Sequence, residues 1–413
     1  MSCRPEANWA GFGVDLAPEE SPHVGVLRRP PVDNVRDSRR SLQGGRMQRH
    51  AQVVATVEAI IERVGPGVTS TRKLVSLGIS DSRIETAVAR GELLRLRRGS
   101  VLPTSTWAAA TAAERHRLAV DAALIAHPTA VVSHTSAAQI LSLPLAGWLP
   151  TASPGPSTRL DNGSGTRTSG RIGSSSALLG IPTVHLTIPG RHRTDAWLRI
   201  HGSPLPAAHW ATLGPVPVTG YSRTLADTAS MLKPGPALAL ADAAVRQIVG
   251  QIDPHADPRQ AARDDKYRTA ACRAVSAVLD SCAHRTGIDA ARQALALANP
   301  ASESVLESIS RWQMHRRRLP MPQCGMPITG DDGRTYWADF VWWDLLIIGE
   351  ADGALKYATR DDLIREKARQ EALERAGWLV IRWNWAEAVT DPRIMIRRIE
   401  RAIERRRMHP PLF

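Results

Sequence analysis

The sequence predicts a multidomain α/β protein, and three observations support this fold class. The chain has 413 residues, which is more than one domain ordinarily holds, so two or three domains are expected. Stretches with apolar residues at helical spacing alternate with short apolar runs bounded by turn residues, and such runs are typical of strands. The hydrophobic content of 43% is enough for ordinary buried cores.

The N-terminal end is expected to remain outside these domains. Residues 1–46 are rich in Pro, Gly, Ser, Arg and acidic side chains and show no hydrophobic period. Such a segment buries too little apolar surface to offset its chain entropy, which predicts a disordered N-terminal extension. Met47 begins the first clear helical pattern, so an over-extended gene start is the other explanation.

Residues 47–105 are predicted to form a winged-helix DNA-binding domain. Three helical patterns follow one another along this segment. The second is closed by Gly78, and the third begins at Ser80 or Asp81, both good N-caps. The stretch GELLRLRRGSV then predicts a basic hairpin, which is the wing in this layout.

In a winged helix the third helix enters the major groove and the wing meets phosphates. The helix side chains predicted to face DNA are Ser82, Arg83, Glu85, Thr86 and Arg90. The wing side chains predicted to bind phosphate are Arg95, Arg97 and Arg98. The alternative is a protein-interaction module whose arginines are simply solvated.

Two stretches of this region carry a family resemblance. TRKLVSLGI and GELLRLRRG resemble the N-terminal winged helix of AbiEi-type (type IV) antitoxins from abortive-infection toxin–antitoxin systems. The resemblance implies DNA binding and makes a cognate toxin a candidate partner. A homodimer stays open.

Residues 106–250 are predicted to form an α+β connecting domain, and residues 251–300 a helical linker. The expected helices lie at 112–126, 222–230 and 237–249, with another opening at His134, and the expected strands lie at 183–188, 198–201 and 215–219. A flexible loop is expected at the Gly/Ser/Thr/Pro-rich residues 150–177. A lone histidine beside Ser and Thr is more often a cap or core residue than a catalyst, so no chemistry is assigned here.

The most informative stretch is YWADFVWWDLLIIGEADGALKY, which holds Asp339, Glu350, Asp352 and Lys356. Its two apolar runs predict a pair of strands. Burying an unpaired carboxylate costs several kcal/mol, roughly, so these acids need a metal or a cationic partner. The stretch therefore predicts a divalent-cation site, with Lys356 as a candidate cationic partner.

The expected geometry of this site depends on the strand register. With the turn placed at Trp343–Asp344, Ile348 lies opposite Asp339 and Glu350 is the diagonal neighbour of Asp339. Diagonal neighbours have Cβ atoms roughly 7–8 Å apart, a spacing at which two carboxylates can hold a cation. Asp352 shares the face of Glu350 if the strand continues.

Three C-terminal stretches resemble PD-(D/E)xK nuclease domains similar to very-short-patch repair endonucleases. They are D-F-V-W, G-E-x-D-G-x-x-K-Y and E-K-x-R-x-x-x-L-x-x-x-G-W-x-V-I-R-W. The resemblance covers residues 301–404 and places a restriction-endonuclease-like α/β domain at residues 301–413. It implies a small mixed sheet flanked by helices and Mg²⁺- or Mn²⁺-dependent hydrolysis of a phosphodiester bond.

The resemblance also implies roles for the acids. Asp339 and Glu350 correspond to metal ligands, and Asp352 to a further ligand or catalytic acid; Glu307 or Glu303, expected on one face of the preceding helix, is another candidate acid. Lys356 corresponds to the partner of water or phosphate. In the best-known members of the superfamily the lysine follows the acid by two residues, whereas here Asp352 holds that position.

Later side chains of this domain have two readings each. Arg369, on a helix expected at 361–377, points either at the scissile phosphate or at a nearby acid. Trp378, Trp383 and Trp385 are expected to pack the core around the last strand, LVIRW, with stacking on bases as the alternative. The arginine-rich tail is expected to form an amphipathic basic helix, either as a solvated face or as a non-specific DNA contact.

The composition of the chain indicates which class of partner and which cellular compartment to expect. The net charge of +13 and the pI of about 10.5, mostly from arginine, favour nucleic acid over membrane as the partner. No stretch approaches the ~20 apolar residues of a membrane helix, and no signal peptide is seen. The four cysteines show neither metal spacing nor a disulfide framework, which suits a cytoplasmic protein.

Three functions follow as hypotheses. The first is an Mg²⁺-dependent DNA endonuclease with a winged-helix targeting domain, acting in defence or DNA repair. The alternative is a non-enzymatic DNA-binding, antitoxin-like transcriptional regulator with a degenerate nuclease fold. The third and weaker hypothesis is an RNA nuclease.

Overall fold

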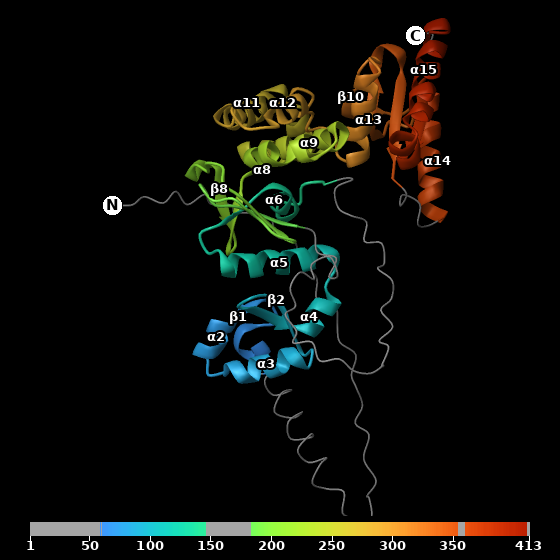
Figure 1. Cartoon of the computed structure of the whole chain (residues 1–413). Coiled ribbons are helices and arrows are strands. Elements are labelled where there is room, and N and C mark those ends of the chain that lie inside the picture. The colour runs from blue at the N-terminus through green and yellow to red at the C-terminus, as the bar shows by residue number, and fades with distance from the viewer. Residues whose placement is uncertain (1–57, 59, 146–182, 354–359, 411–413) are drawn as a thin grey trace, which may run out of the picture. The chain divides into compact units, whose positions relative to one another are not determined.

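The computed structural model describes residues 58, 60–145, 183–353 and 360–410, which form a mixed α/β protein with three β-sheets (Figure 1). The chain divides into two compact units, Met1–Pro128 and Thr129–Phe413. The expected N-terminal extension, the expected loop at 150–177 and Lys356 lie outside the described residues. Within the described part of the chain, no helix combines the length and apolar character needed to cross a bilayer.

The N-terminal unit follows the predicted order of helices and hairpin. After the helical residues 60–64 come β1 (Thr69–Ser70), α2 (Thr71–Ser76), α3 (Asp81–Ala89), β2 (Leu93–Arg97), β3 (Ser100–Pro103), α4 (Thr104–Ala109) and α5 (Ala112–Ala126). The three strands form a sheet in the order β1-β3-β2. The core of the unit is formed by Ile60, Leu74, Ile84, Leu93 and Val101 with their neighbours.

Local signals set the ends of these helices. The side chain of Ser70 accepts a hydrogen bond from the Lys73 amide at 3.1 Å and so caps α2. Gly78 and Gly91 adopt positive φ angles of 87° and 72° after α2 and α3, a conformation that glycine reaches without strain. The predicted start of α3, with Ser80 as N-cap, is confirmed.

The first part of the second unit is a mixed six-stranded sheet. Its strands are β4 (Val131–Val132), β5 (Val184–Thr187), β6 (Arg193–Thr194), β7 (Leu198–His201), β8 (Trp210–Leu213) and β9 (Val216–Thr219), in the order β6-β7-β5-β4-β9-β8. The three predicted strands are confirmed as β5, β7 and β9. The strands β4 and β6 were not predicted because two residues are too few to show a period of two, and the four-residue strand β8 was not predicted either.

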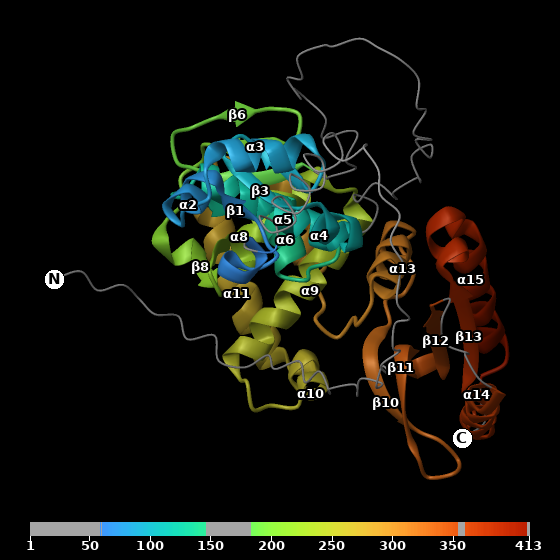
Figure 2. The same cartoon turned by 90° about the horizontal axis from the view of Figure 1, so that it is seen from below.

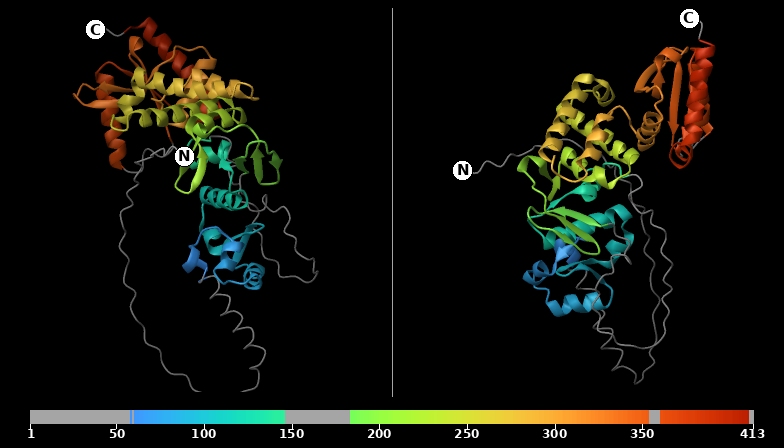
Figure 3. Two further views of the ribbon diagram at one scale, coloured as in Figure 1. Left: turned by 90° about the vertical axis from the view of Figure 1, so that its left-hand side faces the viewer. Right: turned by 45° about the horizontal axis from the view of Figure 1, so that its top comes forward.

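Helices pack against this sheet and against one another. They are α6 (His134–Ile140), η1 (Ala207–His209), α8 (Tyr221–Thr228), η2 (Ala229–Met231), α9 (Pro234–Ile252), α10 (Pro258–Arg263), α11 (Asp265–Ser281) and α12 (Ile288–Ala296). The helices α11 and α12 lie against α9 (Figures 1 and 3). Leu240, Val245, Val275, Leu279 and Ala291 belong to the core that these three helices share.

The last part of the chain forms a four-stranded sheet with three helices. Its elements are α13 (Val305–Arg316), β10 (Gln323–Thr329), β11 (Thr335–Trp342), η3 (Trp343–Leu345), β12 (Ile347–Asp352), α14 (Arg360–Arg375), β13 (Leu379–Asn384), η4 (Ala386–Thr390) and α15 (Pro392–Met408). The strand order is β10-β11-β12-β13, with antiparallel pairs except for the parallel pair β12–β13.

The two faces of this sheet have different helical cover (Figure 2). Phe340 and Trp383 pack with Ile399 of α15 and with residues of α13 on one face. Ile348 packs with Leu373 of α14 on the other. This alternation is that of a sheet buried on both sides, so polar groups at its strand ends are held between two helical layers.

Two of the three tryptophans expected in this core are buried there. Trp383 and Trp378 are buried, whereas Trp385 is 44% exposed, so the expectation for Trp385 is wrong. The strand ends at Asn384, and Trp385 has helical backbone angles as the N-cap of η4. Its side chain therefore no longer follows the alternation of the strand.

Candidate active site

A cavity of about 550 Å³ lies where α13, β11, β12 and α14 meet. Its acidic lining consists of Glu303, Glu307, Asp339, Glu350, Asp352 and Glu366. Its basic lining consists of Arg259, Arg369 and Arg382. The fold thus gathers the acids that the sequence singled out, although they come from three separate segments of the chain.

The register of β11 and β12 differs from the predicted one. Val341 pairs with Ile348, so the expected pairing of Ile348 with Asp339 is wrong. The turn is longer than two residues, because η3 is followed by Leu346 with φ 46° before β12 begins. This shifts the register by two, which keeps each side chain on its face but brings Glu350 level with Asp339.

Glu350 is buried, 3% exposed, and pairs with an arginine of α14. Arg369 donates to Glu350 Oε1 at 2.6 Å, to Glu366 Oε1 at 2.9 Å and to the Trp337 carbonyl at 3.0 Å. Of the two roles predicted for Arg369, pairing with a nearby acid is therefore the one present in this structure. A carboxylate buried to this degree needs such a partner.

Glu307 is also buried, in the first turn of α13. The Ser304 side chain accepts from the Glu307 amide at 3.2 Å, and Glu307 Oε2 accepts from the Glu303 amide at 2.7 Å. Because α13 begins at Val305, Glu303 precedes the helix, and the expectation that Glu303 and Glu307 share a helix face is wrong. The cap at Ser304 fixes this boundary.

Two other acids of the cavity are paired with arginines. Glu303 accepts two hydrogen bonds from Arg259, at 3.0 and 3.1 Å. Asp352 Oδ2 lies 3.3 Å from Arg382 Nη1, and Arg382 also pairs with Glu366. Asp339 Oδ2 accepts from the Ala351 amide at 2.8 Å, which ties the acid to the neighbouring strand.

Electrostatic repulsion affects the pKa values within a group of three of these carboxyl groups. Burial and, next, the charge of Asp339 raise the pKa of Glu307 to about 7. The same two causes raise the pKa of Glu350 to about 7, against the opposing effect of Arg369. Since Asp339 acts on both, the three groups form one cluster in which like charges favour binding of a proton or a cation.

The donor set suits Mg²⁺ or Mn²⁺, because such hard ions prefer carboxylate oxygens. Burial is the main cause of the raised pKa values of Glu307 and Glu350, and the negative charge of Asp339, which a divalent ion would neutralise, is the next. A shared ion requires the side chains to close in and Glu350 to loosen its pair with Arg369. The described residues also hold a different group of possible metal ligands. Its members are His134, His185 and His201, whose ligand atoms all lie within 4.8 Å of one another.

The raised pKa values predict how stability depends on pH. The folded state binds more protons than the unfolded state between the ordinary glutamate pKa of 4.5 and about 7. This contribution is complete below the ordinary pKa and is lost as pH rises through the folded one. In EDTA we expect the Tm of wild-type protein to fall between about pH 5 and about pH 8 more than that of Glu350→Gln. Glu374→Gln, on the exposed side of α14, should keep the wild-type dependence, and equal slopes in all three proteins would contradict the assignment.

In the N-terminal unit, the residues predicted to contact DNA lie on α3 and on the β2–β3 hairpin. Arg83, Thr86 and Arg98 are exposed, Arg90 is the C-cap of α3, and Arg97 ends β2. Arg95 pairs with Glu85 at 2.5 Å, which links the hairpin to α3.

The hydroxyl of Thr86 is used within its own helix. Thr86 Oγ1 donates to the Ser82 carbonyl at 2.7 Å. This back-bonding is common for threonine in helices. A base contact by Thr86 would therefore come from its methyl group or require the hydroxyl to rotate.

Comparison with known proteins gives two relatives. No family model matches the chain. Two proteins from different strains of Mycobacterium tuberculosis, each named as an uncharacterized protein, are 28% identical to it over 243 residues, which is 57% of this chain and 82% of theirs. Their names state no activity, so a function has to be inferred from the residues of the site.

Proposed function

We propose that the protein is an Mg²⁺- or Mn²⁺-dependent DNA endonuclease that a winged-helix domain directs to its substrate. One observation carries this proposal: Glu307, Asp339 and Glu350 line a single cavity, in which burial and, next, the charge of Asp339 raise the pKa of both glutamates. A fold with no chemistry to perform has little need to bury two glutamates beside the half-buried Asp339, because each buried carboxylate costs free energy unless it is paired.

The cavity offers the groups that phosphodiester hydrolysis requires. Asp339 and Glu350 would hold the metal ion, with Glu307 or Asp352 as the third acid. When bound, the ion supplies a Lewis acid and lowers the pKa of a coordinated water. Arg369 and Arg382 place guanidinium groups at the same cavity, where they can bind a phosphate oxygen once the acids hold the ion. Lys356 remains the proposed partner of the attacking water.

The arrangement of elements supports the proposal at both ends of the chain. The four-stranded sheet with α13 and α15 on one face and α14 on the other is what the nuclease resemblance implies. In the N-terminal unit, two short helices followed by the β2–β3 hairpin match the expected winged helix, with α3 as the helix that enters the major groove. The net charge of +13 favours a polyanionic partner.

DNA binding by the hairpin can be tested by its salt dependence. Arg98 is exposed in the turn between β2 and β3. If it binds one phosphate, Arg98→Ala should reduce the slope of log K against log salt by about 1 and weaken binding to all sequences alike. Arg117→Ala removes the same charge from α5, where Arg117 pairs with Asp121, and should leave the slope unchanged. A loss of affinity confined to one sequence would contradict a phosphate contact.

A specific observation also favours the second function, a DNA-binding, antitoxin-like regulator without catalysis. Four acids of the cavity are paired with arginines: Glu303 with Arg259, Glu350 with Arg369, Asp352 with Arg382, and Glu366 with both Arg369 and Arg382. In a regulator these pairs would be permanent and would stabilise the fold. A cognate toxin would then be the partner to seek.

Incubation of supercoiled plasmid with purified protein and Mg²⁺ or Mn²⁺ separates the two functions. We expect nicked or linear DNA that EDTA abolishes. Salt-sensitive DNA retention without cleavage, in either metal, would favour the regulator. Metal-dependent cleavage of RNA but not of DNA in the same assay would point to the RNA nuclease.

A further inference from the structure

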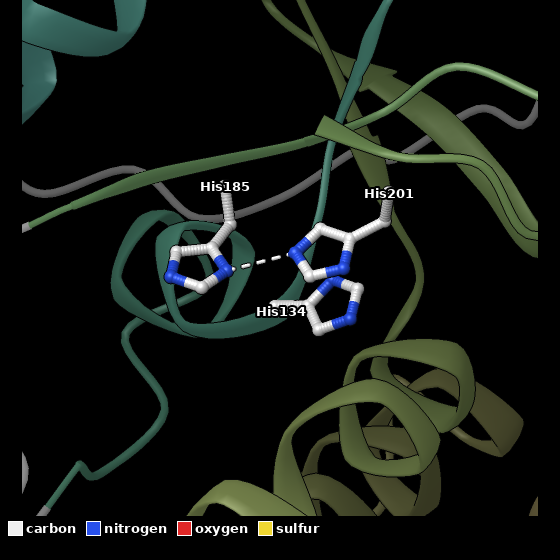
Figure 4. A group of neighbouring side chains, drawn as sticks. All are labelled: His134, His185 and His201. Carbon is white, nitrogen blue, oxygen red and sulfur yellow. Dashed lines mark hydrogen bonds between the residues drawn. The ribbon is translucent and has the colours of Figure 1, made fainter. Parts of the chain in front are cut away.

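Three histidines that are far apart in the sequence meet on the six-stranded sheet (Figure 4). His134 is the first residue of α6, directly after β4, while His185 lies on β5 and His201 ends β7. The strands β5 and β7 are parallel neighbours in which His201 pairs with Thr187, two residues beyond His185. Side chains alternate along a strand, so His185 and His201 lie on the same face.

Their ring nitrogens are close enough to share an ion. His185 Nδ1 lies 2.9 Å from His201 Nε2, and one ligand nitrogen of each of the three residues lies within 4.8 Å of the others. Zinc–imidazole bonds measure about 2.0–2.1 Å, so two nitrogens on one tetrahedral ion lie roughly 3.3 Å apart. The His185–His201 pair is near that spacing but is joined by a hydrogen bond, so a shared ion would replace the proton between the two rings.

A buried carboxylate stands beside the group. Asp227 Oδ1 accepts from Arg223 Nε at 2.8 Å and also pairs with Arg285. Asp227 Oδ2 is buried, has no hydrogen-bond partner among the residues that the structure describes, and lies 3.8 Å from His134 Nδ1. A carboxylate next to a metal-binding histidine commonly fixes the orientation of its ring. The two guanidinium groups hold Asp227 in place and balance its charge.

The backbone of His134 and the hydrogen bonds around it also suit a binding site. His134 has a φ of 53°, which side-chain-bearing residues rarely adopt, and such strain collects at functional sites. Ser133 Oγ lies 2.9 Å from His134 Nδ1 and accepts from Thr187 Oγ1 at 2.8 Å, which anchors the turn.

We propose that His134, His185 and His201 form a site for one divalent transition-metal ion of the Zn²⁺ class, with Asp227 as the carboxylate partner of His134. Imidazole nitrogen suits such ions better than Mg²⁺, so the site differs in chemistry from the carboxylate cavity. The rings of His134 and His201 stack at 3.5 Å, and their lone pairs lie in the ring planes, so the two rings must splay to bind one ion. The bound ion would tie α6, β5 and β7 together. This proposal does not depend on the endonuclease proposal.

The test is a titration of the EDTA-treated full-length protein with Co²⁺, followed by competition with Zn²⁺. We expect one Co²⁺ per chain to show the intense visible absorption of tetrahedral coordination and to be displaced by Zn²⁺, whether or not the carboxylate cavity takes up a further ion. His201→Gln is the variant of choice, because His201 is the least buried of the three histidines, and it should weaken binding at least about 10-fold. His255→Gln removes an exposed histidine elsewhere in the unit and should bind as wild type.

Two further measurements keep the outcome clear. Glu350→Gln should retain the Co²⁺ spectrum, and loss of the spectrum in that variant would assign the ion to the carboxylate cavity and overturn the proposal. X-ray absorption spectroscopy of zinc bound to the wild-type protein should show imidazole ligands. This measurement does not depend on the folding of any variant. A shell of oxygen ligands alone, no stoichiometric ion in folded protein, or equal affinity in folded His201→Gln would each overturn the proposal.

Discussion

Glu350→Gln protein is expected to lose metal-dependent cleavage of plasmid DNA by about 1,000-fold or more while binding DNA as well as the wild type or better. The amide keeps the size of the side chain and removes the charge that would hold the ion. Because the pKa of Glu350 is raised to about 7, the wild-type carboxyl is already partly protonated near neutral pH, so the neutral amide should fold normally. DNA affinity should not fall, because one negative charge leaves the cavity.

Asp339→Asn should behave in the same way, since Asp339 lies level with Glu350 and acts on both buried glutamates. Glu374→Gln makes the same chemical change on the exposed side of α14, where Glu374 accepts from Gln370, and should cleave as wild type. Initial rates of nicking and a filter-binding isotherm measured on the same preparations separate catalysis from binding. Wild-type rates in both Glu350→Gln and Asp339→Asn would remove these residues from the metal site.

Asp242→Ala is expected to lower the free energy of unfolding by about 3–5 kcal/mol, because it leaves a buried arginine without its ion-pair partner. Asp242 of α9 accepts from Arg311 Nη1 of α13 at 2.8 Å and from the Asn299 amide at 2.7 Å. Arg311 also donates to the Leu297 carbonyl. This network holds α13, and hence Glu307, against the helical core of the unit.

Urea unfolding of a double-mutant cycle can isolate this pair. Burial raises the pKa of Asp242 even though Arg311 opposes the shift, so the attraction of Arg311 does not fully offset the cost of desolvating the carboxylate. We therefore expect Asp242→Leu with Arg311→Met to be more stable than either single variant. Asp280→Ala breaks the exposed pair with Arg292 and should change the unfolding midpoint little. Equal small losses for Asp242→Ala and Asp280→Ala would show that the buried pair is not structural.

Much of the local structure could be predicted from the sequence because its signals lie within a few residues of one another. Ser80 and Gly78 mark the boundary between α2 and α3, and the apolar alternation of residues 183–188 marks β5. The same kind of signal failed at Glu303, where Ser304 was not recognised as the N-cap that starts α13 after it. Two-residue strands such as β4 carry no period and could not have been found.

The sequence by itself determined the types and local order of the candidate functional groups. The acids within two apolar runs, the capped helices and the basic hairpin all follow from residues near one another in the chain. These features depend on short-range backbone preferences and on side-chain periodicity, which need no knowledge of distant contacts.

The tertiary structure alone decided which groups meet. The longer turn at Leu346 sets the register that brings Glu350 level with Asp339. The packing of α14 against the sheet places Arg369 where it pairs with Glu350. Likewise, only the pairing of β5 with β7 brings His185 to His201. Such contacts depend on how distant segments pack, and burial then sets the pKa values of the groups they enclose, so neither can be obtained from spacing along the chain.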